Sequence, residues 1–118
     1  MKYVTPDGKF WIKTANESAI VGLTKEALAE YGMFVVYMAK QTTLKFIHPG
    51  LSMAAIETIN YLGCLPSPIG GMLTNVNHAM LEDDPAAIGE DTILFEVSDV
   101  LLPPNLIQQR ENNAMSIL

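Results

Sequence analysis

Apolar residues along the chain are gathered in short segments that turn-forming residues separate. The segments are rich in Val, Ile, Phe and Tyr, and Gly, Pro or Asn lies between them. Their length of about 4 to 8 residues is typical of β-strands rather than helices. The pattern therefore predicts strands at residues 10–14, 19–23, 33–38, 44–47, 52–59, 72–76 and 93–97.

One segment between these strands has the features of a short helix. Thr24 is a good N-cap, and Glu26 would lie near the positive end of the helix dipole. Residues 27–29 favour helix, and Gly32 stands where a left-handed C-terminal residue is expected. We therefore predict a helix over residues 25–31.

Two further segments are compatible with helix. One is a turn over residues 77–81. The other lies near the C-terminus, where a domain of residues 1–102 is followed by a polar, amide-rich tail, residues 103–118. From Asn105 on, the spacing of three apolar residues in this tail permits a weakly amphipathic helix: Leu106, Ala114 and Ile117. Many short strands with few helices predict a mainly β sandwich or barrel with short peripheral helices.

Composition narrows the class of protein. A chain of 118 residues is long enough for one domain, and 49% hydrophobic against 17% charged residues excludes a disordered chain. Thirteen acidic against seven basic side chains give a formal net charge of -6, so nucleic acid is not an expected partner. Cys64 is the only cysteine, which excludes an internal disulfide. With no signal core and no run of 18 apolar residues, no membrane partner is expected and the cytoplasm is the expected compartment.

Several motifs, taken in order and spacing, resemble the core of the glycine cleavage system H protein family. The segment Ile-Glu-Thr-Ile-Asn at residues 56–60 is followed by Ser-Pro-Ile-Gly-Gly at 67–71, a strand ending Val-Asn, and Leu-Glu-Asp-Asp-Pro at 81–85. Upstream, Lys-Phe-Trp at residues 9–11 stands where the family has His-Glu-Trp. The resemblance covers roughly residues 5–98, about four-fifths of the chain.

The resemblance implies a lipoyl-domain-like hammerhead β-sandwich, the fold shared with biotinyl carrier domains. In this family a lysine on an exposed hairpin carries lipoate, and the lipoyl arm carries an aminomethyl group between active sites. The implied partners are glycine decarboxylase, the aminomethyltransferase and lipoate-handling enzymes. The segment at residues 63–66 departs from the polar stretch of the family.

The position of the family's lipoyl-lysine is held here by Asn60, three residues after Glu57. A carboxamide nitrogen is not a nucleophile that a ligase can acylate, and no lysine follows Lys45. The resemblance therefore implies lipoate as the family's cofactor, whereas the residues predict an unmodified Asn60 and no bound cofactor. An Asn in this position is also explained by a turn. Glu57 is either a residual recognition residue or a solvated strand charge.

Other candidate chemistry is sparse. Cys64 with His48 or His78 would be the basis of a Cys-His nucleophile pair or a zinc site, but the three residues lack the close spacing of paired ligands. We therefore expect a half-buried thiol, two surface imidazoles, no metal and no catalytic residue. Trp11 is expected to anchor packing, the methionines are expected to fill core gaps, and the acidic run 82–84 to be a solvated loop.

Three functions remain open at this point. The first is a glycine cleavage H-like protein that keeps the lipoyl-domain fold but acts as a non-carrier binding or scaffold protein. The second is a genuine aminomethyl shuttle in glycine cleavage. The third, a small enzyme using Cys64, lacks a base in register, so we expect a chain that is not an enzyme.

Overall fold

The computed structural model describes residues 1–32, 35–40, 45–58, 60–77 and 88–109, with the backbone alone for 35–40. Its one described helix, α1, is Lys25–Tyr31. The described strands are β1 (Lys2–Val4), β2 (Phe10–Ala15), β3 (Ser18–Leu23), β4 (Val35–Lys40), β5 (Phe46–Ile47), β6 (Ser52–Thr58), β7 (Leu62–Pro66), β8 (Gly70–Val76), β9 (Phe95–Leu101) and β10 (Ile107–Gln109).

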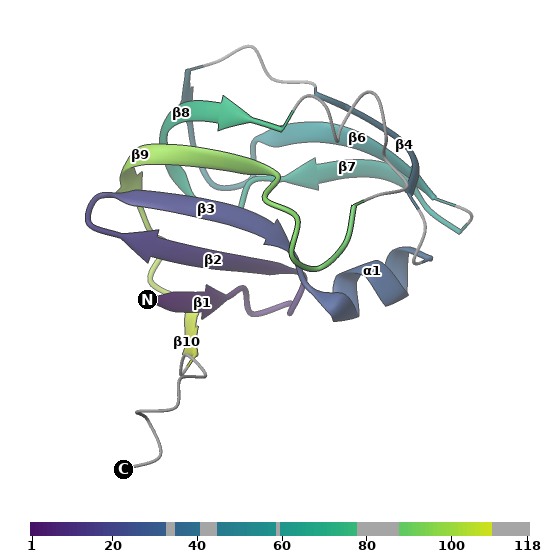
Figure 1. Ribbon diagram of the computed structural model, residues 1–118, viewed down its shortest axis with the longest axis horizontal. Coiled ribbons are helices and arrows are strands. Elements are labelled where there is room, and N and C mark those ends of the chain that lie inside the picture. Colours follow the sequence, from purple (N-terminus) through teal and green to yellow (C-terminus); the bar gives the residue numbers. More distant parts are fainter. Residues whose placement is uncertain (33–34, 41–44, 59, 78–87, 110–118) are drawn as a thin grey trace.

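The strands form two antiparallel sheets, which confirms the prediction of a mainly β fold. The larger sheet has seven strands in the order β10-β1-β2-β3-β9-β8-β5, and the smaller has three in the order β4-β6-β7. Figure 1 shows the smaller sheet beside one end of the larger one, with α1 close to the ends of β6 and β7. The hairpin of β6 and β7 is therefore part of the smaller sheet, next to the helix.

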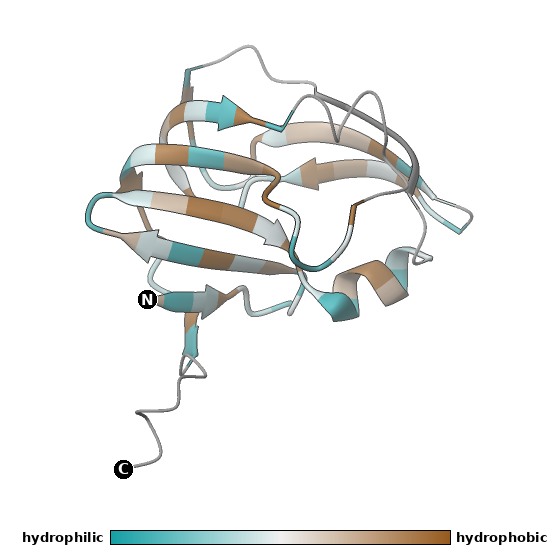
Figure 2. Cartoon of the chain, viewed as in Figure 1, coloured by the Kyte–Doolittle hydropathy of each residue, from teal (hydrophilic) through white to brown (hydrophobic). Residues whose placement is uncertain are grey.

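The hydrophobic core is built by alternate residues of the strands. Ile12 and Val21 of the larger sheet and Ile56 of the smaller sheet are fully buried and belong to one cluster. Along β2, strongly hydrophobic residues alternate with less hydrophobic or hydrophilic ones (Figure 2), because successive side chains of a strand point to opposite faces. The apolar residues whose spacing predicted the strands are therefore the residues that pack the two sheets together in one core.

The predicted helix is confirmed together with both of its ends. The side chain of Thr24 accepts a hydrogen bond from the backbone N–H of Ala27, at 3.0 Å. Gly32 ends the helix with a φ of 120° and donates its backbone N–H to the carbonyl of Leu28. No described helix is long and apolar enough to cross a membrane.

Each predicted strand overlaps a described one, but β1, β7 and β10 were not predicted. The segment of β7, Leu-Gly-Cys-Leu-Pro, lacks β-branched residues and contains the two residues that strands usually exclude. The helix expected from Asn105 is wrong for residues 107–109, which pair with β1 as β10 because their backbone completes the edge of the larger sheet. The rest of that helix, residues 110–118, lies outside the described residues, as does most of the turn expected at 77–81.

Candidate functional site

Asn60 lies in the tight turn between β6 and β7. The backbone N–H of Thr58 donates to the carbonyl of Tyr61 at 2.8 Å, which closes a loop of two residues. Glu57 is paired with Leu62 in the strands directly below. Asn60 is exposed to solvent. Asn60 is therefore presented at the tip of a hairpin.

The buried hydroxyl of Thr58 ties this turn to the end of α1. It donates to the backbone carbonyl of Tyr31 and accepts the backbone N–H of Asn60 at 3.2 Å. Gly32 lies against the same turn, since a Cβ placed on it would stand 3.2 Å from Thr58 Oγ1 and 3.4 Å from the side-chain nitrogen Nδ2 of Asn60. The positive φ of Gly32 and this close approach both favour glycine.

A contact between two tyrosine rings also holds the hairpin against the helix. The ring centroids of Tyr31 and Tyr61 are 4.7 Å apart, with the planes tilted by 43°. The Tyr61 ring also covers Gly63, where a Cβ would stand 2.5 Å from the phenol oxygen. Tilted aromatic pairs at this distance are stabilising beyond their buried area. The turn that carries Asn60 is therefore held from both α1 and β7.

The environment of Tyr31 keeps its phenol neutral. Burial, followed by the neighbouring phenol of Tyr61, raises the pKa of Tyr31 from 10.0 to about 12, and the carboxylates of Asp7 and Glu30 act in the same direction. Lys9 Nζ lies 5.4 Å from the centroid of the Tyr31 ring. The same ammonium is 3.7 Å from a carboxylate oxygen of Glu30. Lys9 is thus the lysine that the described contacts bring to this site.

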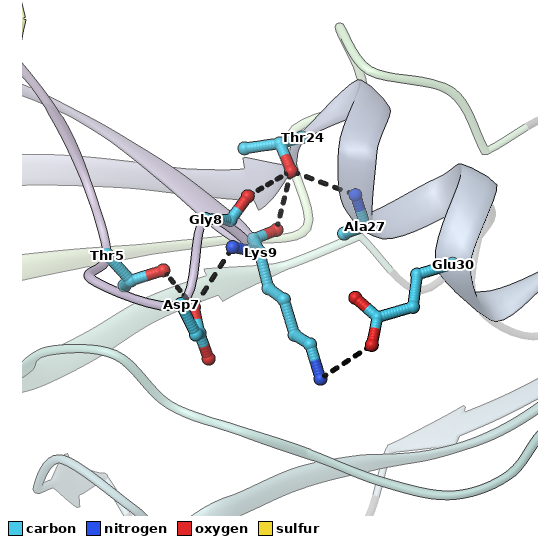
Figure 3. A network of polar contacts seen from close by, with 7 residues as sticks. All are labelled: Thr5, Asp7, Gly8, Lys9, Thr24, Ala27 and Glu30. Atoms are coloured by element: carbon cyan, nitrogen blue, oxygen red, sulfur yellow. Dashed lines mark hydrogen bonds and ion pairs between the residues drawn. The ribbon is translucent and has the colours of Figure 1, made fainter.

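Lys9 is positioned by a polar network centred on Thr24 (Figure 3). The Thr24 hydroxyl donates toward the carbonyls of Gly8, at 2.5 Å, and Lys9, at 3.3 Å, and caps the helix at the same time. Asp7 accepts the Thr5 hydroxyl at 2.6 Å and the backbone N–H of Lys9 at 3.0 Å. This network fixes the loop before β2 against the start of α1.

Residues on the opposite face of the hairpin point to solvent. Glu57 is exposed on β6, and Leu62 and Cys64 are exposed on β7. Leu62 is 77% exposed, the largest exposed fraction among the exposed large hydrophobic residues that the structure describes. The thiol is therefore exposed, and the expectation that it would be half-buried is wrong, because alternation along β7 turns residue 64 outward while Leu65 enters the core.

The described residues hold neither a metal cluster nor the proposed cysteine-histidine arrangement. No group of three His, Cys, Asp or Glu residues that could hold a metal ion occurs among them. His48 lies in the loop after β5 with its Nδ1 3.0 Å from the Pro49 carbonyl, whereas Cys64 belongs to the other sheet. His78 and residues 82–84 lie outside the described residues.

Two of the packing predictions have structural outcomes. Trp11 is buried and donates its indole N–H to the carbonyl of Glu90 at 2.7 Å, as expected of a packing anchor. Met53 is buried in the core, and Met72 is half-buried. By contrast, sequence reasoning missed Tyr31, Tyr61 and Lys9 as parts of the site, since their approach depends on how α1 packs against the hairpin.

The chemistry of the hairpin does not fit covalent attachment of lipoate. Asn60 offers a carboxamide in place of an amine, and neither β6 nor β7 contains a lysine. Lys9 offers an amine beside the Tyr31 ring, but on the loop before β2 and paired with Glu30. The described site therefore presents an exposed amide and aromatic surface rather than an acceptor amine at the hairpin tip.

Comparison with known proteins assigns the chain to a family. The family model described as glycine cleavage H-protein matches residues 1–97. "Glycine cleavage system H protein 5" of Aquifex aeolicus is 34% identical over 91 residues, a match that spans 75% of this chain and 60% of that protein. The glycine cleavage system H protein of Rubrobacter xylanophilus is 31% identical over 110 residues, 86% of each chain.

A solved structure supports the same assignment. The crystal structure of a glycine cleavage system H protein from Mycobacterium marinum superposes with a TM-score of 0.73 at 25% sequence identity, and the match covers 90% of this chain and 88% of that one. The family model, the relatives and the fold agree with one another and with the motifs of the hairpin. The chain therefore belongs to the glycine cleavage H-protein family.

Proposed function

We propose that this chain is a glycine cleavage H-like protein that acts as a non-carrier binding or scaffold protein. The single observation that carries the proposal is Asn60, an exposed carboxamide at the tip of the β6–β7 hairpin. An amide nitrogen is a poor nucleophile because its lone pair is delocalised, so the residue is not a lipoyl acceptor. The protein then works through its surfaces, with no bound cofactor and no catalytic residue.

The exposed face of the hairpin supports a role in protein binding. Tyr61 and Leu62 follow Asn60 directly and are 37% and 77% exposed, so apolar surface lies beside the tip. Exposed apolar side chains next to polar ones are typical of partner surfaces. The partners that the family membership favours are glycine decarboxylase, the aminomethyltransferase and lipoate-handling enzymes. Glu57, exposed on the same face, would take part in their recognition.

A genuine aminomethyl shuttle is the alternative, and it requires an acceptor amine. Among the described residues, Lys9 is the amine that favours this alternative, because it lies against the Tyr31 ring beside the hairpin. Its ion pair with Glu30 and its place on another loop argue against it. The two functions therefore differ in one measurable property, the presence of lipoate on the chain.

Intact-mass measurement after co-expression with a broad-specificity lipoate ligase and lipoate separates the two functions. We expect no lipoyl addition to the parent chain and slow, detectable addition to Asn60→Lys. Asn16→Lys, on the exposed turn between β2 and β3, is the matched control and should stay unmodified. Lipoate on the parent chain, mapped to Lys9 or any other lysine by peptide sequencing, would establish the carrier instead.

A further inference from the structure

A hollow lies on the outer face of the larger sheet and is lined by none of the residues of the Asn60 hairpin. It measures about 500 Å³, within the usual range of small-molecule sites. Its lining comes from the strands β10, β1 and β2, which pair with one another, from the start of α1 and from the segment before β9. Figure 1 shows β1 and β2 side by side. Phe10 and Ile12 face the core, so Trp11 between them and Lys13 after them lie on the outer face of the sheet. Lys13 is exposed there, whereas Trp11 is 6% exposed and borders the hollow with the small part of its ring that is left uncovered.

Strand pairing arranges the floor in two adjacent rows of different chemistry. One row contains only hydrogen-bond donors and amides: Gln109, Lys2 and Lys13. The next row, two residues further along each strand, is apolar: Val4 of β1 and Trp11 of β2. Neighbouring rows on one face of a strand are about 7 Å apart, so a polar head in the first row leaves an apolar tail of a few carbons over the second.

The donor row contains two like charges at close quarters. Lys2 and Lys13 are directly opposite in the antiparallel ladder, where Cβ atoms are about 5 Å apart and like charges are destabilising. Neither is in an ion pair with a described residue; Lys13 Nζ lies instead 5.2 Å from the centroid of the Trp11 ring. An anion between the two ammonium groups would relieve this repulsion and accept hydrogen bonds from both.

The apolar row is fixed before any ligand arrives. The Trp11 indole donates its N–H to the Glu90 carbonyl at 2.7 Å. It also packs against Gly22, where a Cβ would stand 2.1 Å from the ring. Because the ring is held by two independent contacts, binding requires little further ordering of the floor.

Three carboxylates restrict the kind of anion that fits. The hollow is lined by a third lysine, Lys25, and by the carboxylates of Glu26, Glu90 and Asp91, and the chain as a whole carries a net charge of -6. The carboxylates disfavour polyanions such as nucleic acid, whose charges would extend beyond the two lysines of the donor row. A single small anionic group with an uncharged tail avoids this repulsion.

From this arrangement we infer that the hollow is a binding site for small carboxylic acids, with the carboxylate between Lys2 and Lys13 and an apolar tail on the Trp11 indole. The assignment uses none of the hairpin residues and is independent of whether the chain carries lipoate. It requires only that the two rows bind the two halves of one ligand.

Trp11 is the only tryptophan of the chain, so its fluorescence reports on the floor of this hollow directly. The probe is hexanoate. Hexylammonium, which has the same apolar tail but a positively charged head, tests the need for the carboxylate, and acetate, which has the carboxylate but no longer tail, tests the need for the apolar part. Calorimetric titration of the same samples detects binding that leaves the indole emission unchanged. The variants are Lys2→Gln and Lys13→Gln, with Lys45→Gln, an exposed lysine before β5, as the control.

Hexanoate should bind saturably and more tightly than acetate or hexylammonium. Each of Lys2→Gln and Lys13→Gln should weaken the affinity by about tenfold, the loss expected for one charge-assisted hydrogen bond, and Lys45→Gln should leave it unchanged. Absence of hexanoate binding in both measurements, equal binding of hexylammonium, or equal affinity of Lys2→Gln and the parent chain would each overturn the assignment.

Discussion

The ring of Tyr61, on the hairpin that carries Asn60, lies 4.7 Å from the ring of Tyr31 at the end of α1. This contact joins an element that is local in sequence, the helix, to a turn almost thirty residues later. It places the hairpin tip beside the helix and next to Lys9, whose ammonium lies over the other tyrosine. The geometry of the proposed binding surface therefore depends on an aromatic contact between α1 and the hairpin, which β6 and β7 alone would not provide.

Removing the Tyr61 ring should loosen the hairpin. We expect Tyr61→Ala to lower the free energy of unfolding by about 2 kcal/mol, from lost apolar contact and lost aromatic pairing. Leu62→Ala, at a side chain 77% exposed, is the control and should change it by no more than about 0.5 kcal/mol. Urea unfolding followed by circular dichroism measures both. Equal effects of the two variants would show that the tyrosine contact contributes little.

The stability of the fold should fall at high pH because of Tyr31. Its pKa is raised to about 12 in the folded chain from 10.0, so the neutral phenol is the form that the fold favours. The resulting stability is fully present below pH 10 and is lost as the pH rises toward 12. Tyr31→Phe, which has no proton to lose, should flatten this alkaline decline in urea unfolding. A decline of the same steepness in the variant would assign it to other groups.

Replacing Thr24 by alanine should lower the stability of the fold more than replacing an ordinary surface threonine. Its hydroxyl caps α1 and also bonds the carbonyl of Gly8. Thr24→Ala is expected to destabilise the fold by about 1 to 2 kcal/mol, the upper part of the range for a lost N-cap. Thr24→Ser keeps the hydroxyl and should retain most of the stability. Thermal unfolding of the three proteins tests this, and a serine variant as unstable as the alanine variant would contradict the hydrogen-bonding argument.

Gly22 should not accept even one methyl group. A Cβ there would meet the Trp11 ring at 2.1 Å and the Thr92 carbonyl at 2.6 Å, so the indole must move. We expect Gly22→Ala to destabilise the fold by about 3 kcal/mol and to shift the Trp11 emission toward that of an exposed indole. Gly89→Ala, with nothing within 4 Å of the added Cβ, is the control. Unchanged emission in the first variant would show that the ring is not held over position 22.

The sequence was most informative where local rules decide the structure. Thr24 and Gly32 mark the ends of α1 in the sequence because capping needs only neighbouring residues. Strand β7 was missed because its Leu-Gly-Cys-Leu-Pro segment has low strand propensity and forms through pairing with β6. Asn60 was placed on a hairpin by family resemblance, and the turn is there.

The surroundings of Asn60 were beyond sequence reasoning. Tyr31 and Tyr61 have no periodic relationship, and Lys9 comes from a third segment. Their contacts depend on the packing of α1 against the smaller sheet, which no local pattern encodes. The cross-strand pair Lys2 and Lys13 was missed for a related reason, since β1 and its register with β2 were not predicted.

The hydroxyl of Thr58 links the carbonyl of Tyr31 to the backbone N–H of Asn60, so one buried group closes both the helix end and the hairpin turn. Opening of either segment takes a hydrogen-bond partner from the hydroxyl that also holds the other, so we expect the two segments to exchange their amide hydrogens as one cooperative unit. A partner protein that binds the hairpin tip would then slow hydrogen exchange in the last turn of α1, even though the partner makes no contact with that turn. Binding at the hairpin tip should therefore be detectable as slower hydrogen exchange in the helix.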